Sequence, residues 1–145
     1  MKNRRFFLLM ILGLLSNFGK EIVESRTKLM KIVYLVQKEK SRIVERIIGV
    51  SEPYTFEWYL FGPFSKEVLD DLELLENENL INIIPEEKEL YIQYNFKLTD
   101  KGRKELEAFL KKLNPEDIKE LENYVKKFKN MSLKQIKQYV YRKYL

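Results

Sequence analysis

The segment of residues 65–99 reads SKEVLDDLELLENENLINIIPEEKELYIQYNFKLT, and its pattern decides the fold. Ser65 is a residue type that caps helices, because its hydroxyl accepts a hydrogen bond from a free backbone N–H of the first turn. The residues that follow it predict a helix over residues 66–77. The inward-facing side chains of this helix recur at helical spacing: Val68, Leu69, Leu72 and Leu75.

The second half of this segment alternates apolar and polar residues with a period of two, which is typical of a strand with one buried face. We predict a strand over residues 89–99, preceded by a strand over residues 80–84 and a turn at residues 85–88. The face expected on the core is Leu90, Ile92, Tyr94, Phe96 and Leu98, and the face expected in solvent is Tyr91, Gln93 and Asn95. A helix that leads directly into a two-stranded hairpin is the arrangement of a winged helix.

Further elements are expected before this unit. They are a helix over residues 4–17, a helix over residues 26–40, a short helix within residues 42–53 and a strand over residues 54–61. Gly49 is expected to end the short helix, and Gly62 with Pro63 to end the strand.

Three more helices are expected after it. They cover residues 100–113, residues from 115 onward behind the cap Asn114, and residues 133–144 behind a capping-box pattern of Ser132 and Gln135. The sequence therefore predicts a mostly helical α+β fold, a winged helix with additional C-terminal helices. We expect a winged-helix domain over residues 1–113, with residues 114–145 as a helical extension packed on the same domain.

The composition points away from catalysis. The chain of 145 residues has no cysteine and no histidine, so disulfides, thiolate metal sites and His-dependent nucleophilic systems are excluded. Asp70 or Asp71 with Glu86 and Lys88 has the residue types of a metal-dependent nuclease, but Glu86 and Lys88 fall in the predicted turn, where nothing holds them rigidly. We expect no enzyme activity, no cofactor and no bound metal.

The N-terminus resembles a targeting signal only superficially. Lys2, Arg4 and Arg5 precede ten apolar residues, whereas a membrane-spanning helix needs about 20. We interpret this run as a buried helix of a cytoplasmic protein without a membrane partner. Abundant Lys and Glu with few Gln and no Cys is a composition typical of hyperthermophile proteins, so we expect an archaeal thermophile as the source; an AT-rich genome would give a similar bias.

Charge is distributed unevenly along the chain. Residues 1–40 hold nine Lys and Arg against three acids, residues 101–145 hold thirteen against six, and residues 41–100 hold five against thirteen. Basic ends favour a polyanionic partner such as double-stranded DNA. The candidate nucleic-acid-binding residues are Arg26, Lys28, Lys31, Lys126, Lys127, Lys129, Lys134, Lys137, Arg142 and Lys143.

The acidic centre points to a different kind of partner. The helix over residues 66–77, which would enter the DNA groove in a helix-turn-helix protein, is rich in carboxylates that DNA phosphates would repel. It could instead dock a basic protein. The candidate partner-binding residues are Glu67, Asp70, Asp71 and Glu73.

Three segments resemble one known family, and a fourth resembles winged-helix regulators more widely. Residues 19–39 (GKEIVESRTKLMKIVYLVQKE) and 138–144 (QYVYRKY) resemble YwgA-like proteins and the Panacea-type (SocA-like) antitoxin domains, as do residues 56–67 (FEWYLFGPFSKE). Residues 96–102 (FKLTDKG) resemble the segment that ends the wing in many winged-helix regulators. The chain departs from the pattern at Met30, where many relatives carry Gln. The resemblance implies a winged-helix-like fold.

Two functions follow from these observations. The first is a winged-helix transcriptional regulator or accessory factor that binds nucleic acid through its basic terminal helices. The second is a protein-interaction module, antitoxin-like or a subunit of a larger assembly, that uses its acidic helix. Either is compatible with a homodimer.

Overall fold

The computed structural model describes residues 4–145, so Lys2 of the basic start lies outside the described residues. Its elements are α1 (Arg4–Leu15), α2 (Arg26–Glu39), α3 (Ser41–Ile48), β1 (Glu57–Tyr59), β2 (Gly62–Phe64), α4 (Lys66–Asn77), β3 (Ile81–Glu87), β4 (Ile92–Leu98), α5 (Asp100–Leu110), α6 (Pro115–Lys129) and α7 (Leu133–Tyr144). The fold is therefore the mostly helical α+β type that the sequence predicts. It carries two small antiparallel hairpins, β1–β2 and β3–β4.

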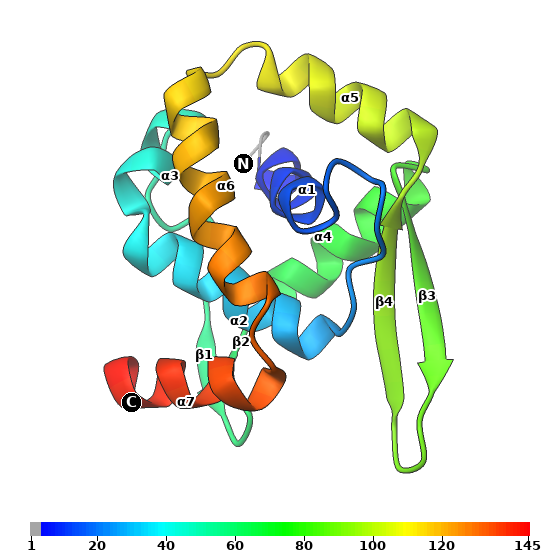
Figure 1. The fold of residues 1–145 in the computed structure, drawn as a ribbon, viewed down its shortest axis with the longest axis vertical. Coiled ribbons are helices and arrows are strands. Elements are labelled where there is room, and N and C mark those ends of the chain that lie inside the picture. The colour runs from blue at the N-terminus through cyan, green and yellow to red at the C-terminus, as the bar shows by residue number, and fades with distance from the viewer. Residues whose placement is uncertain (1–3) are drawn as a thin grey trace.

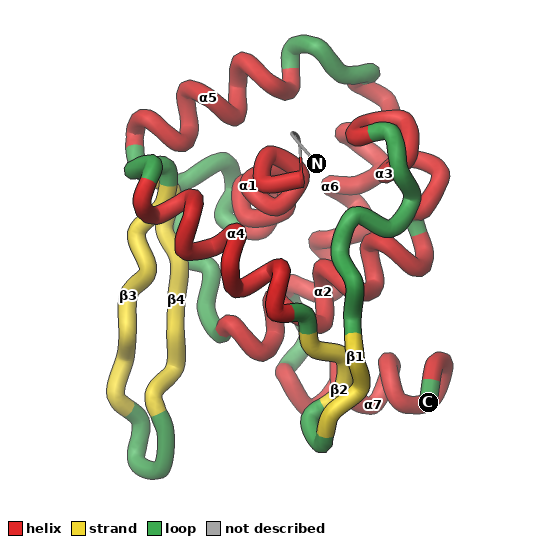
Figure 2. Tube along the Cα trace, turned by 180° about the vertical axis from the view of Figure 1, so that it is seen from behind, coloured by secondary structure: helices red, strands yellow, loops and turns green. Residues whose placement is uncertain are grey.

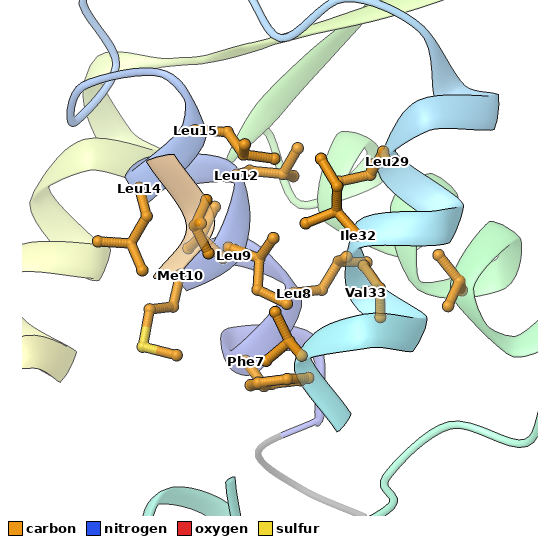
Figure 3. Packing of buried hydrophobic residues seen from close by; sticks show 14 of the residues in the cluster. Phe7, Leu8, Leu9, Met10, Leu12, Leu14, Leu15, Leu29, Ile32 and Val33 are labelled. Carbon is orange, nitrogen blue, oxygen red and sulfur yellow. The ribbon is translucent and has the colours of Figure 1, made fainter. Parts of the chain in front are cut away.

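Helix α1 forms the centre of the molecule, with α4, α5 and α6 around it (Figure 1). Its residues from Phe7 to Leu15 are all buried, which is the expected result for a helix that is apolar on every side. Figure 3 shows Leu8, Leu9 and Leu12 directed toward the side chains of α2. The helix ends at Leu15, two residues before the predicted end, because the backbone turns left-handed at Asn17 (φ 52°). No helix within residues 4–145 has the length and apolar character needed to cross a membrane.

Helix α4 leads directly into the β3–β4 hairpin, as predicted for a winged helix, and Ser65 caps it by accepting from the N–H of Val68. The hairpin pairs Ile81 with Leu98 at its base and Glu87 with Ile92 at its tip. The turn therefore lies at residues 88–91, three residues later than predicted.

The burial predicted for β4 is correct at its base and wrong at its tip. Phe96 and Leu98 are buried, whereas Leu90 is 90% exposed and Ile92 is 51% exposed. Asn95, expected in solvent, is 7% exposed, because its carboxamide oxygen accepts from the N–H of Ser25. The physical reason is that the wing extends beyond the helical body, so only its base has a core to pack against (Figures 1 and 2).

The strand predicted over residues 54–61 is also corrected. Tyr54 enters the core at 2% exposure, and β1 covers only three residues before the chain reverses into β2. Gly62 has φ +103°, a conformation that a β-branched or aromatic residue would hardly adopt, and it allows this reversal. The predicted single strand is therefore a short hairpin.

The C-terminal helices pack on the rest of the chain. Helix α6 contacts α1 and α2, and α7 contacts α2 and β2. The predicted caps are present: Asn114 accepts from the N–H of Glu116, and Ser132 forms a capping box with Gln135.

Candidate functional site

Both hairpins project from the same end of the molecule, with the N-terminal part of α2 between them (Figures 1 and 2). Two hollows lie there, of about 470 and about 570 Å³, and they share Arg26, Thr27 and Leu133 as lining residues. We call this continuous surface the groove. On the wing side it is lined by Ile22, Tyr91, Ile92 and Tyr94, and on the β1–β2 side by Met30, Tyr59, Phe61, Pro63 and Phe64.

Exposed hydrophobic side chains concentrate at the groove and on the two hairpin tips beside it. Twelve large hydrophobic residues are exposed in the described chain. Nine of them belong to this region, namely Ile22, Trp58, Tyr59, Leu60, Phe61, Leu90, Tyr91, Ile92 and Leu133. Leu60 is 89% exposed and Phe61 71%. Since exposed apolar side chains gathered in one place are unusual on a monomer, this surface is a candidate binding site.

The charged residues that line the groove are mostly cationic. They are Arg26, Lys28, Lys31 and Lys129, against the single acid Glu24. The guanidinium carbon of Arg26 lies 4.4 Å from the centre of the Tyr94 ring, which keeps this cation at the junction of the two hollows. The N-terminus of α2 adds the positive end of a 14-residue helix.

Lys31 anchors the β1–β2 hairpin from below. Its side chain is buried, and its ammonium donates to the carbonyl of Phe61. Burial in the first place, and the nearby Lys137 in the second, lower the pKa of Lys31 to about 8. Gly62 leaves the room for this contact, because a Cβ there would lie 3.3 Å from the Tyr141 ring and 3.4 Å from the Lys31 ammonium.

Helix α7 positions the same hairpin from the other side. The Tyr141 hydroxyl donates to the carbonyl of Leu60 at 2.9 Å, and the Tyr141 ring packs on Trp58. The helix is itself held on α2 by Glu39, whose carboxylate accepts from Tyr124, Tyr139, Tyr144 and Lys143. Burial alone would raise the pKa of Glu39, but these hydrogen bonds outweigh it and lower the pKa to about 2.

The structure does not bring the sequence-predicted basic residues together as one surface. Arg26, Lys28 and Lys129 line the groove, but Lys28 donates to the carbonyl of Lys129, and Lys129 pairs with Glu21. The rest lie on α6 and α7: Lys126 pairs with Glu122, Lys143 with Glu39, Lys127 lies over Tyr124, Lys137 over Tyr141, and Lys134 and Arg142 are exposed. Lys31 requires a correction, because at 2% exposure its ammonium cannot reach a phosphate.

The acidic residues predicted on α4 are also divided. Asp71 requires a correction: it is buried, accepts from Arg4 at 2.8 Å and from the Tyr54 hydroxyl at 2.7 Å, and so does not face a partner. Glu67 is engaged by Arg4 and by the backbone N–H of Thr55. Asp70 and Glu73 are exposed. Residues 4–145 contain no cluster of three or more Asp and Glu side chains that could hold a metal ion.

The groove itself was missed by sequence reasoning, although a signal was present. The runs Tyr59-Leu60-Phe61 and Leu90-Tyr91-Ile92 place three consecutive apolar residues where the chain reverses. Such runs are unfavourable at turns unless something covers them, so they mark candidate binding surfaces.

Fold and groove together define the chain as a small winged-helix-like domain with an exposed hydrophobic groove. Residues 29–144 match the family described as "Antitoxin SocA-like, Panacea domain", and the chain belongs to this family. Uncharacterized protein YwgA of Bacillus subtilis (strain 168) is 29% identical over 77 residues, which is 53% of this chain and 41% of that protein. The chain thus spans about two fifths of this relative's length. No solved structure matches the chain at a significant level.

Proposed function

We propose that the chain is an antitoxin-like protein-interaction module that binds a partner protein through the groove. The observation that carries this proposal is the concentration of nine exposed large hydrophobic residues at the groove and on the hairpin tips that flank it. Burial of such residues at the centre of an interface supplies most of its binding free energy, and aromatic side chains contribute the most. The family description, which names an antitoxin, agrees with a role in binding another protein.

The proposed surface differs from the acidic helix expected at first. On α4 only Asp70 and Glu73, of the four predicted residues, are free to meet a partner, because Arg4 engages Glu67 and Asp71. The groove offers both apolar area and charge. The proposed role is binding without catalysis; with neither histidine nor cysteine in the chain, nucleophilic systems that depend on these residues are excluded.

Nucleic-acid binding is a second proposal. Its support is the set of exposed cations on α6 and α7, which includes Lys126, Lys127, Lys134 and Arg142. The exposed carboxylates Asp70 and Glu73 oppose the docking of α4 in a DNA groove. DNA binding would then use the terminal helices and weaken steeply with salt.

The test of the first proposal is binding to the product of the gene next to the one that encodes this chain, measured by calorimetry. The double variant Leu60→Glu with Phe61→Glu should weaken binding by at least about a hundredfold, because it places two charges among the most exposed apolar side chains of the proposed interface. Both side chains are largely exposed, so the fold should tolerate the change. The matched control, Asp70→Lys with Glu73→Lys, should bind like the natural chain. Loss of binding only in the control would assign the interface to α4 instead.

The second proposal is tested by gel shift with duplex DNA at two salt concentrations. If it is correct, neutralising Lys126, Lys127 and Lys129 together should weaken binding and flatten its salt dependence by about one unit for each phosphate that no longer meets a cation. Absence of a shift at both concentrations would remove this proposal.

A further inference from the structure

We propose that the groove takes an extended, acidic segment of the partner protein, which pairs with the free edge of β4 at Ile92 and Tyr94 as a third strand. This inference rests on the proposed protein-binding function and specifies the chemistry of the segment that is bound.

The edge of β4 that faces the groove already carries the beginning of a third strand. Val23 forms an antiparallel bridge with Phe96, with both N–H to O distances at 2.8 Å. The chain then turns away at Ser25, which has φ +74° and caps α2. The third strand therefore ends after a single bridge, and the edge beyond it is left open.

Ile92 and Tyr94 present their backbone groups on this same edge. In a strand the N–H and C=O groups of alternate residues point to the same side, so the groups of Tyr94 and Ile92 share the direction of those of Phe96. The opposite strand agrees with this assignment, because the residue paired with Tyr94 is Pro85, which has no N–H to donate. Among the backbone hydrogen bonds that residues 4–145 form outside their helices and strands, none involves Ile92 or Tyr94.

This open edge borders the groove rather than bulk solvent on all sides. The 470 Å³ hollow is lined by Tyr91, Ile92, Gln93 and Tyr94, together with Ile22 and Leu133. A strand added to β4 would bring its own backbone into pairing and its alternate side chains against these apolar walls. Strand addition of this kind obtains affinity from the main chain and specificity from alternate side chains.

The charges that line the groove indicate that the bound segment is negatively charged. Four cations line the groove, but Lys31 is buried and Lys129 pairs with Glu21, which leaves Arg26 and Lys28 against the single acid Glu24. Arg26 lies at the junction of the two hollows without an ion-pair partner among the described residues. A basic segment would be repelled by these cations. A helical segment would leave the β4 edge unpaired. The favoured occupant is therefore extended, with carboxylates that alternate with branched apolar residues.

The experiment uses the full chain labelled with ¹⁵N and three short peptides as probes. The first alternates Glu with Val and Ile, the second replaces each Glu by Lys, and the third carries Glu, Ala and Leu at helical spacing. We expect only the first to shift the amide signals of Ile92 and Tyr94 and to slow their hydrogen exchange by at least about tenfold. Equal protection by the lysine or the helical peptide, or a shift of the same amides by a short DNA duplex alone, would overturn the proposal.

A pair of variants at one position isolates the backbone contribution. Tyr94→Pro and Tyr94→Ala both remove the ring, but only proline removes the N–H on the open edge. Proline should weaken binding of the acidic peptide by about a further tenfold, the loss expected for one hydrogen bond. Thermal unfolding checks that both variants fold, and hydrogen exchange in the natural chain gives an independent measurement if proline destabilises the wing.

The same pair separates this inference from the proposed function. If the neighbouring gene product loses binding to the Leu60→Glu, Phe61→Glu variant but binds both Tyr94 variants equally, strand pairing is overturned and the function stands. If that protein binds the Leu60→Glu, Phe61→Glu variant as tightly as the natural chain, the proposed function, protein binding through the groove, is refuted.

Discussion

Glu39 is the residue through which α2 holds the C-terminal helix. Three tyrosine hydroxyls and the Lys143 ammonium donate to one carboxylate that is mostly shielded from water. Replacing Glu39 by Gln should destabilise the protein by about 2 kcal/mol, because charged hydrogen bonds become neutral ones and one amide group lacks an acceptor. Urea unfolding at pH 7 measures this. The control Glu52→Gln, whose partner Lys38 is exposed, should cost less than about 0.5 kcal/mol; an equal loss in both would contradict the assignment.

The same residue predicts a pH dependence. The pKa of Glu39 falls to about 2 in the folded chain from an ordinary value of 4.5, so its contribution is present above pH 4.5 and is lost as pH falls toward 2. The difference in unfolding free energy between the natural chain and Glu39→Gln should therefore shrink over this range. A difference that stays constant from pH 6 to pH 3 would show that the carboxylate is not responsible.

Lys31 also predicts a pH dependence of stability, but in the alkaline range and from a group that is destabilising when charged. Its pKa of about 8, against 10.5 when unfolded, means that between these values the unfolded chain binds more protons at this residue. Its contribution to stability should therefore rise with pH over this window. Replacing Lys137 by Ala should raise the pKa of Lys31, as NMR titration of the side chain would show, because a nearby positive charge is removed. Lys134→Ala, an exposed change on the same helix, is the control and should leave it unchanged.

At the scale of elements, the close approach of the wing base and α5 depends on Gly102. A Cβ at this position would lie 1.9 Å from the carbonyl oxygen of Leu80, which is backbone and cannot move aside. Gly102→Ala should therefore destabilise the protein by about 2–3 kcal/mol, although alanine normally favours a helix over glycine by about 1 kcal/mol. Chemical unfolding measures whether Gly102→Ala lowers or raises the free energy of unfolding, with Lys104→Ala on the same helix as the control. A stabilised Gly102→Ala variant would refute the close packing.

Elements governed by local rules could be predicted from the sequence. Ser65, Asn114 and Ser132 each accept the expected backbone N–H, and the helices that begin behind them start at the predicted residues. The wing was predicted less well, because a period of two indicates a strand without indicating how far the core reaches along it. Ile92 fits the apolar pattern as well as Phe96 does, yet the first is 51% exposed and the second fully buried.

At the scale of the whole molecule, the candidate site could not be predicted because it is assembled from distant segments. Ile22, Phe61, Tyr94 and Leu133 are far apart in the sequence and meet only when the two hairpins project from the same end. Counting charges along the sequence did not identify which charged residues reach the surface, for a related reason. Lys31 and Asp71 look like surface charges in the sequence, whereas tertiary contacts with Phe61 and with Arg4 bury them.

The C-terminal helices complete both the core and the groove, and truncation tests this. A chain that ends after residue 113 would expose the surface of α1 that α6 contacts and would lose the buried side chains Leu121, Val125 and Phe128, so we expect it to lack a cooperative unfolding transition. A chain that ends after residue 131 keeps α6 but loses Ile136 and Val140, two fully buried side chains, and the hairpin anchor Tyr141. It should fold with an unfolding free energy lower by about 3–6 kcal/mol. In ¹⁵N relaxation, residues 57–64 should become mobile while α1 and α4 stay ordered. If the chain of 113 residues instead unfolds cooperatively with an ordered core, the C-terminal helices are an accessory rather than part of one domain.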